Sequence, residues 1–277
     1  TIFLMWLGEQ ITARGVGNGI SLIIMVGIVA EAPGALAGLF ELARQGAIGP
    51  VLLVGLLVLM LASVAGIVYV ERAQRRLLIQ YPKRQMGNKV FQGEASHLPL
   101  KLNTAGVIPP IFASSLLLLP ITVAQLQGAG PDWLQAVVAS LGRGQPLYFS
   151  VYVALIIFFA FFYTAVVFNP QDTADNLRKY GGFIPGIRPG QKTAEYIDYV
   201  LTRITVVGAL YLALVCVLPE VLIAYAGVPF YFGGTSLLIA VSVTMDTVAQ
   251  IQSHLIAQQY EGLIKKAKLK GTPRPGR

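Results

Sequence analysis

The stretch VLLVGLLVLMLASVAGIVYV, residues 51–70, decides the fold, because it carries no charged side chain along its whole length. About 20 mostly apolar residues are needed for a helix to cross the hydrocarbon core of a membrane. Similar runs follow at 105–125, 147–168, 204–219 and 232–251, and only the last contains a charge, Asp246. Of the 277 residues, 55% are hydrophobic and 12% are charged, whereas soluble domains have about 25% charged residues. The sequence therefore predicts an all-α integral membrane protein, a multi-span helical bundle.

The basic residues predict how the chain crosses the membrane. All of the 21 lysines and arginines except Arg44 and Arg143 fall in alternate loops, and such loops face the cytoplasm under the positive-inside rule. The shorter run 20–30 must then cross as well, because Arg14 lies inside and residue 51 enters from outside. We expect one transmembrane domain, 1–277, that is a fragment of a longer protein. Its expected spans are 1–10 (partial), 20–31, 51–70, 105–125, 147–168, 200–219 and 232–252, with inside loops at 71–103 and 169–199 and an inside tail at 258–277.

The first inside loop contains RLLIQYPKRQMGNKVFQ, residues 76–92, in which two strand-like runs flank Gly87-Asn88. This pattern is typical of a β-hairpin. Its basic residues could bind a large anionic partner, either RNA or an acidic protein surface. They could equally only set the topology or contact anionic lipid head groups, and we leave both interpretations open. The basic residues of this loop are Arg75, Arg76, Lys83, Arg84 and Lys89.

The second inside loop opens with NPQDTADNLRKYGG, residues 169–182, which predicts a short helix. Asn169 suits the N-cap and Pro170 the first helical position, while Gly181 suits the end of the helix. Another helix is expected from about Thr193 to Pro219. Since this helix is longer than the membrane core requires, its first turns should project into the cytoplasm.

Between these two helices a single arginine, Arg188, stands in GFIPGIRPGQK, residues 182–192. Pro185 and Pro189 fix the backbone on both sides of it, and the glycine after each proline permits a tight turn. The loop should therefore be stiff without being helical. A guanidinium held in this way suits bidentate capture of a carboxylate or a phosphate. The alternative is an arginine that reaches the lipid head groups, but that role does not require a stiff loop.

Other candidate chemistry is sparse in this sequence. Asp246 lies within the last span, and Gln250 and His254 follow one and two turns later, so this face could line an inner aqueous vestibule. His97 and His254 have no ligand-spaced partners, and Cys216 is the single cysteine, so we expect no metal site, no disulfide and no cofactor. The glycines of RGVGNGIS, residues 14–21, lack the strand-to-helix context of a nucleotide site. No catalytic triad or carboxylate pair is apparent, so an enzyme is not favoured.

These motifs, with FLMWLGEQITARGVGNGIS (3–21), HLPLKLNTAGVIPPIFASS (97–115) and VPFYFGGTSLLI (228–239), resemble the SecY family, the channel subunit of the bacterial Sec protein translocon. The resemblance covers essentially the whole chain, in order. It implies ten helices in two inverted halves, of which this chain would carry the end of the fourth and the fifth to tenth, with the first helices and the plug missing. It therefore implies one half, plus flanking helices, of a protein-conducting channel of the bacterial plasma membrane, with a cytoplasmic C-terminus.

The resemblance also implies functional positions and partners. The channel would supply a path for unfolded polypeptides but no energy, and it would not be an enzyme. The implied partners are the SecE and SecG subunits, the SecA motor ATPase, the ribosome, signal sequences and nascent polypeptides, membrane lipid, and the N-terminal part of the same subunit. The matching residues are Ile24, Ile111 and Ile239 in the pore ring, Ile111, Ser114 and Ser115 at the lateral gate, and Arg75, Arg76, Lys83, Arg84, Lys89 and Arg188 at the docking surface for ribosome or motor.

The depth of the three isoleucines can be checked from the sequence. Each lies about ten residues, or about 15 Å of helix, from the polar end of its span, which is near the midplane. An apolar constriction there can exclude water and ions by dewetting. Ordinary packing is the alternative for any single isoleucine, and the two serines could simply bond to carbonyls of their own helix.

Two other function classes remain open at this stage. A secondary transporter also uses broken helices and inverted repeats, but it requires convergent polar groups at the midplane. A structural scaffold subunit would need neither a basic hairpin nor a stiff arginine loop.

Overall fold

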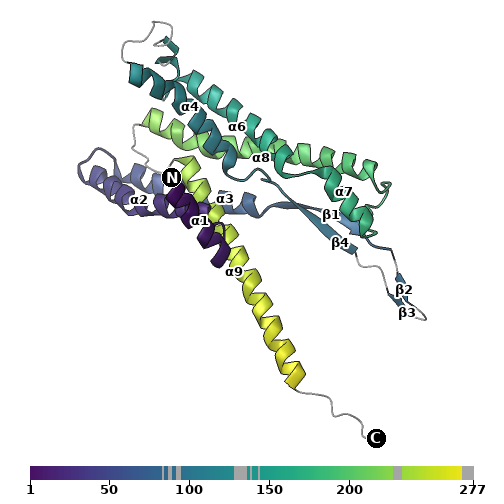
Figure 1. The fold of residues 1–277 in the computed structure, drawn as a ribbon. Helices are drawn as coiled ribbons and strands as arrows, with labels where there is room; N and C mark the ends of the chain where they lie inside the picture. The colour runs from purple at the N-terminus through teal and green to yellow at the C-terminus, as the bar shows by residue number, and fades with distance from the viewer. Residues whose placement is uncertain are drawn as a thin grey trace. The chain divides into compact units, whose positions relative to one another are not determined.

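A computed structural model describes residues 1–82, 84–86, 89–91, 95–127, 136–137, 139–142, 144–226 and 233–269 (Figure 1). These residues belong to two units, one formed by Thr1–Gly34 with Ile239–Arg277 and the other by Ala35–Leu238. Within the described ranges, five helices are long and apolar enough to cross a membrane, and a shorter apolar helix covers Ile108–Val123.

The first unit contains α1 (Ile2–Arg14), the start of α2 (Gly19–Arg44) and most of α9 (Gly234–Leu269). The connection from α1 to α2 is very tight. The Thr12 hydroxyl accepts the Gly19 N–H at 2.8 Å and donates to the Gly8 carbonyl at 2.9 Å. A Cβ atom at Gly19 would collide with the Gly8 carbonyl oxygen. Gly8 and Gly19 therefore allow the close approach of α1 and α2.

Three helices are longer than their apolar runs indicate, and one of them is α9, which continues past the run 232–251 to Leu269, into the stretch expected as an inside tail. α2 continues through Pro33 to Arg44, and α8 (Gln191–Ala226) continues through Pro219. An internal proline removes one helical hydrogen bond but does not always end a helix in a membrane protein, where neighbouring groups compensate. With 36 residues, α8 is about 54 Å long, and its end lies beyond the expected boundary at Pro219.

In the second unit, α4 (Ile108–Gln127), α6 (Pro146–Val167) and α8 lie side by side (Figure 1). Small side chains allow this close packing, since Ala105, Ala160 and Ala209 form one buried cluster. The Phe112 ring of α4 stacks on Phe159 of α6 at 5.6 Å between centroids. α3 (Pro50–Arg72) precedes the hairpin, and its Leu56 packs with residues at the end of α2 and in the α2–α3 loop.

The loop between α3 and α4 contains two antiparallel strand pairs, together called the hairpin below. β2 (Arg84–Met86) pairs with β3 (Lys89–Phe91), which confirms the predicted strand pair, while the predicted turn at Gly87 and Asn88 lies outside the described residues. β1 (Gln74–Gln80) pairs with β4 (Ala95–Lys101). β4 could not be expected from its own residues, because ASHLPLK contains a proline and no β-branched residue.

The hairpin, α7 (Pro170–Lys179) and the start of α8 form one body. Asn169 caps α7 as predicted, since its side-chain oxygen accepts the Gln171 N–H at 3.0 Å. Gly181 follows the helix with φ +74°. The shared core consists of Leu77, Ile79, Leu100, Leu177, Ile184, Ile197, Val200 and Ile204. Apolar side chains from both inside loops thus hold the two loops together.

Candidate functional site

The loop that carries Arg188 begins with a hydrogen-bonded β-turn. The Ile187 N–H donates to the Ile184 carbonyl at 3.1 Å, and Gly186 has φ +85°. Proline at the second position and a left-handed glycine at the third are the requirements of a type II turn, which Pro185 and Gly186 meet. Ile184 is buried in the core shared with the hairpin, so the turn is anchored at its base.

The second half of the loop is tied to α8. The Thr193 hydroxyl donates to the Arg188 carbonyl at 2.9 Å, and Thr193 is only 2% exposed. The Gly190 carbonyl accepts the N–H groups of Thr193 at 3.0 Å and Ala194 at 3.2 Å. The backbone of Arg188 is therefore held from both sides.

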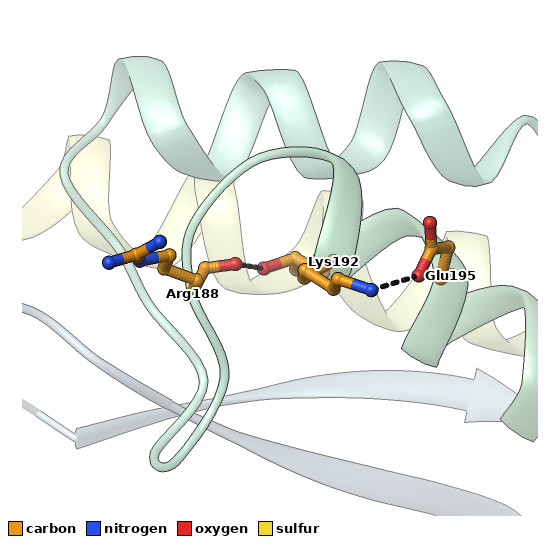
Figure 2. Close-up of polar contacts among 4 residues, drawn as sticks. Arg188, Lys192 and Glu195 are labelled. Atoms are coloured by element: carbon orange, nitrogen blue, oxygen red, sulfur yellow. Dashed lines mark hydrogen bonds and ion pairs between the residues drawn. The ribbon is translucent and has the colours of Figure 1, made fainter.

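The Arg188 side chain is exposed. Its guanidinium forms no hydrogen bond or ion pair with any residue that the structure describes. Lys192, four positions later, is instead paired with Glu195 at 3.2 Å. Figure 2 shows the guanidinium pointing away from this pair. The site thus presents an arginine with a rigid backbone and all of its side-chain donors available to a partner.

Two basic residues of the hairpin, Arg75 and Arg76, lie on opposite faces of β1. Successive side chains of a strand point to opposite faces, and Arg75 lies on the face of β1 that also carries the buried Leu77 and Ile79. Arg76 lies on the opposite, exposed face. Arg84 and Lys89 begin the short strands β2 and β3, but their side chains, and all of Lys83, lie outside the described residues.

Arg75 lines a groove between α8 and the base of the β1–β4 strand pair, which we call the hairpin stem. The groove has a volume of about 670 Å³, and α8 contributes Tyr196, Tyr199 and Arg203 to it. The Arg203 guanidinium lies over the Tyr199 ring, 4.5 Å from its centroid. This group was not among the residues expected from the sequence, although Tyr196, Tyr199 and Arg203 follow the spacing of one helix face.

The three candidate pore residues fall in different units. Ile24 of α2 is 42% exposed and Ile239 of α9 is 7% exposed, and both belong to the first unit. These two helices are neighbours, since the Thr244 hydroxyl lies 3.3 Å from the Met25 sulfur. Ile111 is half-buried on α4 in the second unit. The pore ring therefore stays a prediction. The expected 15 Å of helix before each isoleucine is wrong, since α4 begins only at Ile108 and α9 only at Gly234.

The two candidate gate serines use their hydroxyls within α4. Ser114 donates to the Ile111 carbonyl at 3.0 Å, and Ser115 donates to the same carbonyl at 2.8 Å. Such bonds satisfy the hydroxyls inside a helix and often bend it slightly. The carbonyl that accepts both bonds belongs to Ile111, which is also a candidate pore residue.

Of the polar residues expected on one face of α9, Asp246, Gln250 and His254, only the last two line the same concave surface. Gln250 and His254 line a concave surface of about 640 Å³ together with Glu9 and Thr12 of α1. The Gln250 side chain accepts the Gly17 N–H at 2.8 Å, so it stabilises the α1–α2 connection. Asp246 is exposed and does not line this surface. Within the described ranges, no three His, Cys, Asp or Glu residues are grouped closely enough to hold a metal ion.

Comparison with known proteins identifies the family. The SecY family model matches residues 1–248. The protein translocase subunit SecY of Rickettsia conorii is 54% identical over 270 residues, and that of Pseudomonas aeruginosa is 57% identical over 272 residues. The Escherichia coli subunit is 56% identical over 273 residues. Each match covers 98% of this chain and 62% of the relative, so the chain spans less than two thirds of the length of these relatives.

Solved structures show the same fold. One, described as "The structure of a protein conducting channel", superposes with a TM-score of 0.65 at 17% identity, over 92% of this chain and 63% of that one. Another concerns the plug domain of the SecY protein and superposes with a TM-score of 0.66 at 19% identity, over 92% of this chain and 64% of that one. The protein is thus a helical multi-span membrane protein with the fold of these channel structures, and the chain belongs to the SecY family.

Proposed function

We propose that this chain forms part of a protein-conducting channel within a complete SecY-family subunit. That subunit moves unfolded secretory polypeptides across the bacterial plasma membrane and releases membrane-protein segments sideways into it. The observation that carries this proposal is the family match over residues 1–248. Because the chain covers 62% of its relatives, the channel activity belongs to the complete subunit.

The docking surface for the ribosome or the SecA motor is formed by Arg188 and the exposed side of the hairpin. The exposed guanidinium of Arg188 and its hydrogen-bonded backbone support this role, because a pre-organised arginine loses little entropy when it binds a carboxylate or a phosphate. Arg76, Lys83, Arg84 and Lys89 are proposed to add positive charge for the same partner. Arg75 is separated from Arg76, since it lies on the other face of β1.

The path of the polypeptide is narrowed by Ile24, Ile111 and Ile239. Aliphatic side chains exclude water and ions but offer no hydrogen bond to a passing chain, which suits a seal that must also let polypeptides slide. Ser114 and Ser115 mark the side of the lateral gate on α4. Both serines donate to the Ile111 carbonyl, so a movement of this helical turn would shift all three residues. This supports coupling between the proposed lateral gate and the proposed pore ring.

The proposed assembly sets the orientation and the partners. The two inside loops and the C-terminus face the cytoplasm, as the distribution of lysine and arginine favours. SecE and SecG complete the membrane complex, signal sequences and nascent chains are its cargo, and membrane lipid receives the apolar segments. The channel performs no catalysis, so translation or ATP hydrolysis in the docked partner drives transport.

Reconstitution tests this function. The complete subunit, with SecE and SecG, is placed in lipid vesicles with SecA, ATP and an unfolded secretory precursor, and the fraction of precursor that becomes protected from added protease is measured. We expect ATP-dependent protection and salt-sensitive co-sedimentation of SecA or ribosomes with the vesicles. Vesicles that bind neither partner and protect no precursor would contradict the proposal.

A further inference from the structure

The groove between the hairpin stem and α8 has two distinct parts. Its polar part consists of Arg75, Arg203 and the two tyrosines Tyr196 and Tyr199. Its remaining wall is largely aliphatic and is formed by Ala73, Leu102, Val200, Ile204 and Val207. A groove lined by arginines and by aliphatic side chains suits a ligand that has an anionic head and an apolar tail.

The charge of this groove is not balanced by the protein. Its lining contains two arginines and no acidic residue, and neither arginine forms an ion pair with a carboxylate in the described part of the chain. Glu71 accepts a bond from Asn103 at 2.7 Å, Glu195 is paired with Lys192, and Asp198 does not line the groove. The two guanidinium groups are therefore available for an external anion.

The groove also lies at the ends of the uncharged runs of two candidate membrane-spanning helices, α3 and α8. α3 changes from an uncharged run to Glu71 and Arg72 directly before the groove residue Ala73. On α8, the uncharged run begins directly after Arg203. Tyrosine and arginine are enriched at this depth, because each has an apolar body and a polar end. We therefore expect the polar part of the groove at the level of lipid phosphates.

We propose that this groove binds an anionic phospholipid, with its phosphate between Arg75 and Arg203 and one acyl chain along Ile204 and Val207. Arg75 approaches from the hairpin and Arg203 from the helix, so the phosphate joins the two elements. The stacking of Arg203 on Tyr199 orients its guanidinium for this contact. This inference does not depend on what crosses the channel. It assigns Arg75 to lipid, whereas Arg76 remains available to a soluble partner.

Fluorescence quenching tests the proposal. In the complete subunit, Tyr199→Trp places a reporter in the groove, and the same subunit without this change supplies the background from its own tryptophans. We expect brominated phosphatidylglycerol in nanodiscs to quench the reporter more strongly than brominated phosphatidylcholine. Arg75→Gln with Arg203→Gln should weaken the preference for the anionic lipid by on the order of tenfold or more, since each basic residue at a membrane surface contributes to the attraction.

A matched control separates a specific site from a general charge effect. Arg76→Gln removes the same charge from the same strand but on the opposite face, so it should leave the preference unchanged, and Arg75→Lys with Arg203→Lys should partly restore it. Inorganic phosphate at millimolar concentration should not compete with the lipid. The proposal is overturned if the double glutamine variant keeps the preference, if Arg76→Gln loses it equally, or if inorganic phosphate abolishes it.

Discussion

The hydroxyl of Thr193, at the start of α8, donates a 2.9 Å hydrogen bond to the carbonyl of Arg188. Thr193 is buried, and α8 continues from there as a single helix of 36 residues. The arginine is therefore mounted directly on a helix that is long enough to cross the membrane. A force or displacement applied to Arg188 by a bound partner would be carried to this helix through a short and well-packed connection.

Thr193→Val should loosen this mount while keeping the size and branching of the side chain. Loss of one hydrogen bond costs about 1 kcal/mol, or about a fivefold change in an equilibrium. We expect the affinity of vesicles for SecA to fall several-fold, measured by co-sedimentation, with little change in the amount of folded subunit. Thr193→Ser, which keeps the hydroxyl, should restore binding. Equal affinities for the valine variant and the parent would show that the bond does not position Arg188.

Arg188→Glu should abolish motor-driven export, because it reverses the charge of an exposed side chain that has no partner among the described residues. Export is measured as protected precursor in reconstituted vesicles. Arg44→Glu is the matched control, since Arg44 is also exposed, lies 3.5 Å from Glu41 and is expected on the opposite side of the membrane. Export at the parent rate in the Arg188→Glu variant would remove the docking role.

Local structure was predictable where a residue type strongly favours one structural position, such as asparagine at a helix N-cap. Asn169 was expected to cap α7 and does so. The β2–β3 pair followed from alternating residues around a turn motif. In contrast, β4 is imposed by its register with β1, in which Arg76 is opposite Pro99 and Leu78 is opposite His97. Its own residues give no strand signal, so only the long-range pairing could reveal it.

The candidate site was predictable in composition but not in arrangement. The basic residues of the hairpin were all visible in the sequence, yet the division of Arg75 and Arg76 between two faces depends on where β1 begins, and a shift of one position would exchange them. The groove with Tyr199 and Arg203 required knowing that the hairpin packs on α8. The pore ring is a relationship between distant segments, and no local pattern can define it.

Single-cysteine labelling should place the two inside loops on one face of the membrane. After Cys216→Ser removes the buried native thiol, cysteines introduced at Arg76 and Arg188 should react with a membrane-impermeant maleimide from the same side. A cysteine at Arg44 should react from the other side, since basic residues concentrate in cytoplasmic loops. Labelling of Arg76 and Arg188 positions from opposite sides would contradict the proposed docking surface.

Ile111→Gly combined with Ile239→Gly should make the idle channel conduct ions. Removing two aliphatic side chains widens and wets an apolar constriction, whereas each glycine costs the helix only about 1 kcal/mol. The resting conductance of the complete complex is measured in planar bilayers. Leu116→Gly, on another face of α4, controls for helix weakening and should leave the conductance low. An unchanged conductance in the double variant would exclude these isoleucines from the seal.

Gly19→Ala should disrupt the α1–α2 connection, whereas Gly27→Ala in the same helix should be tolerated. A Cβ atom at Gly19 would meet the carbonyl oxygen and carbon of Gly8 and the Ile11 side chain, while nothing lies within 4 Å of a Cβ atom at Gly27. Since the contact at Gly19 is with backbone, it cannot be relieved by a change of rotamer. We expect a lower thermal midpoint and less folded protein in detergent for Gly19→Ala only. Equal stability of the two variants would mean that α1 and α2 can separate without cost, which would contradict the bonds that Thr12 makes to both glycines, Gly8 and Gly19.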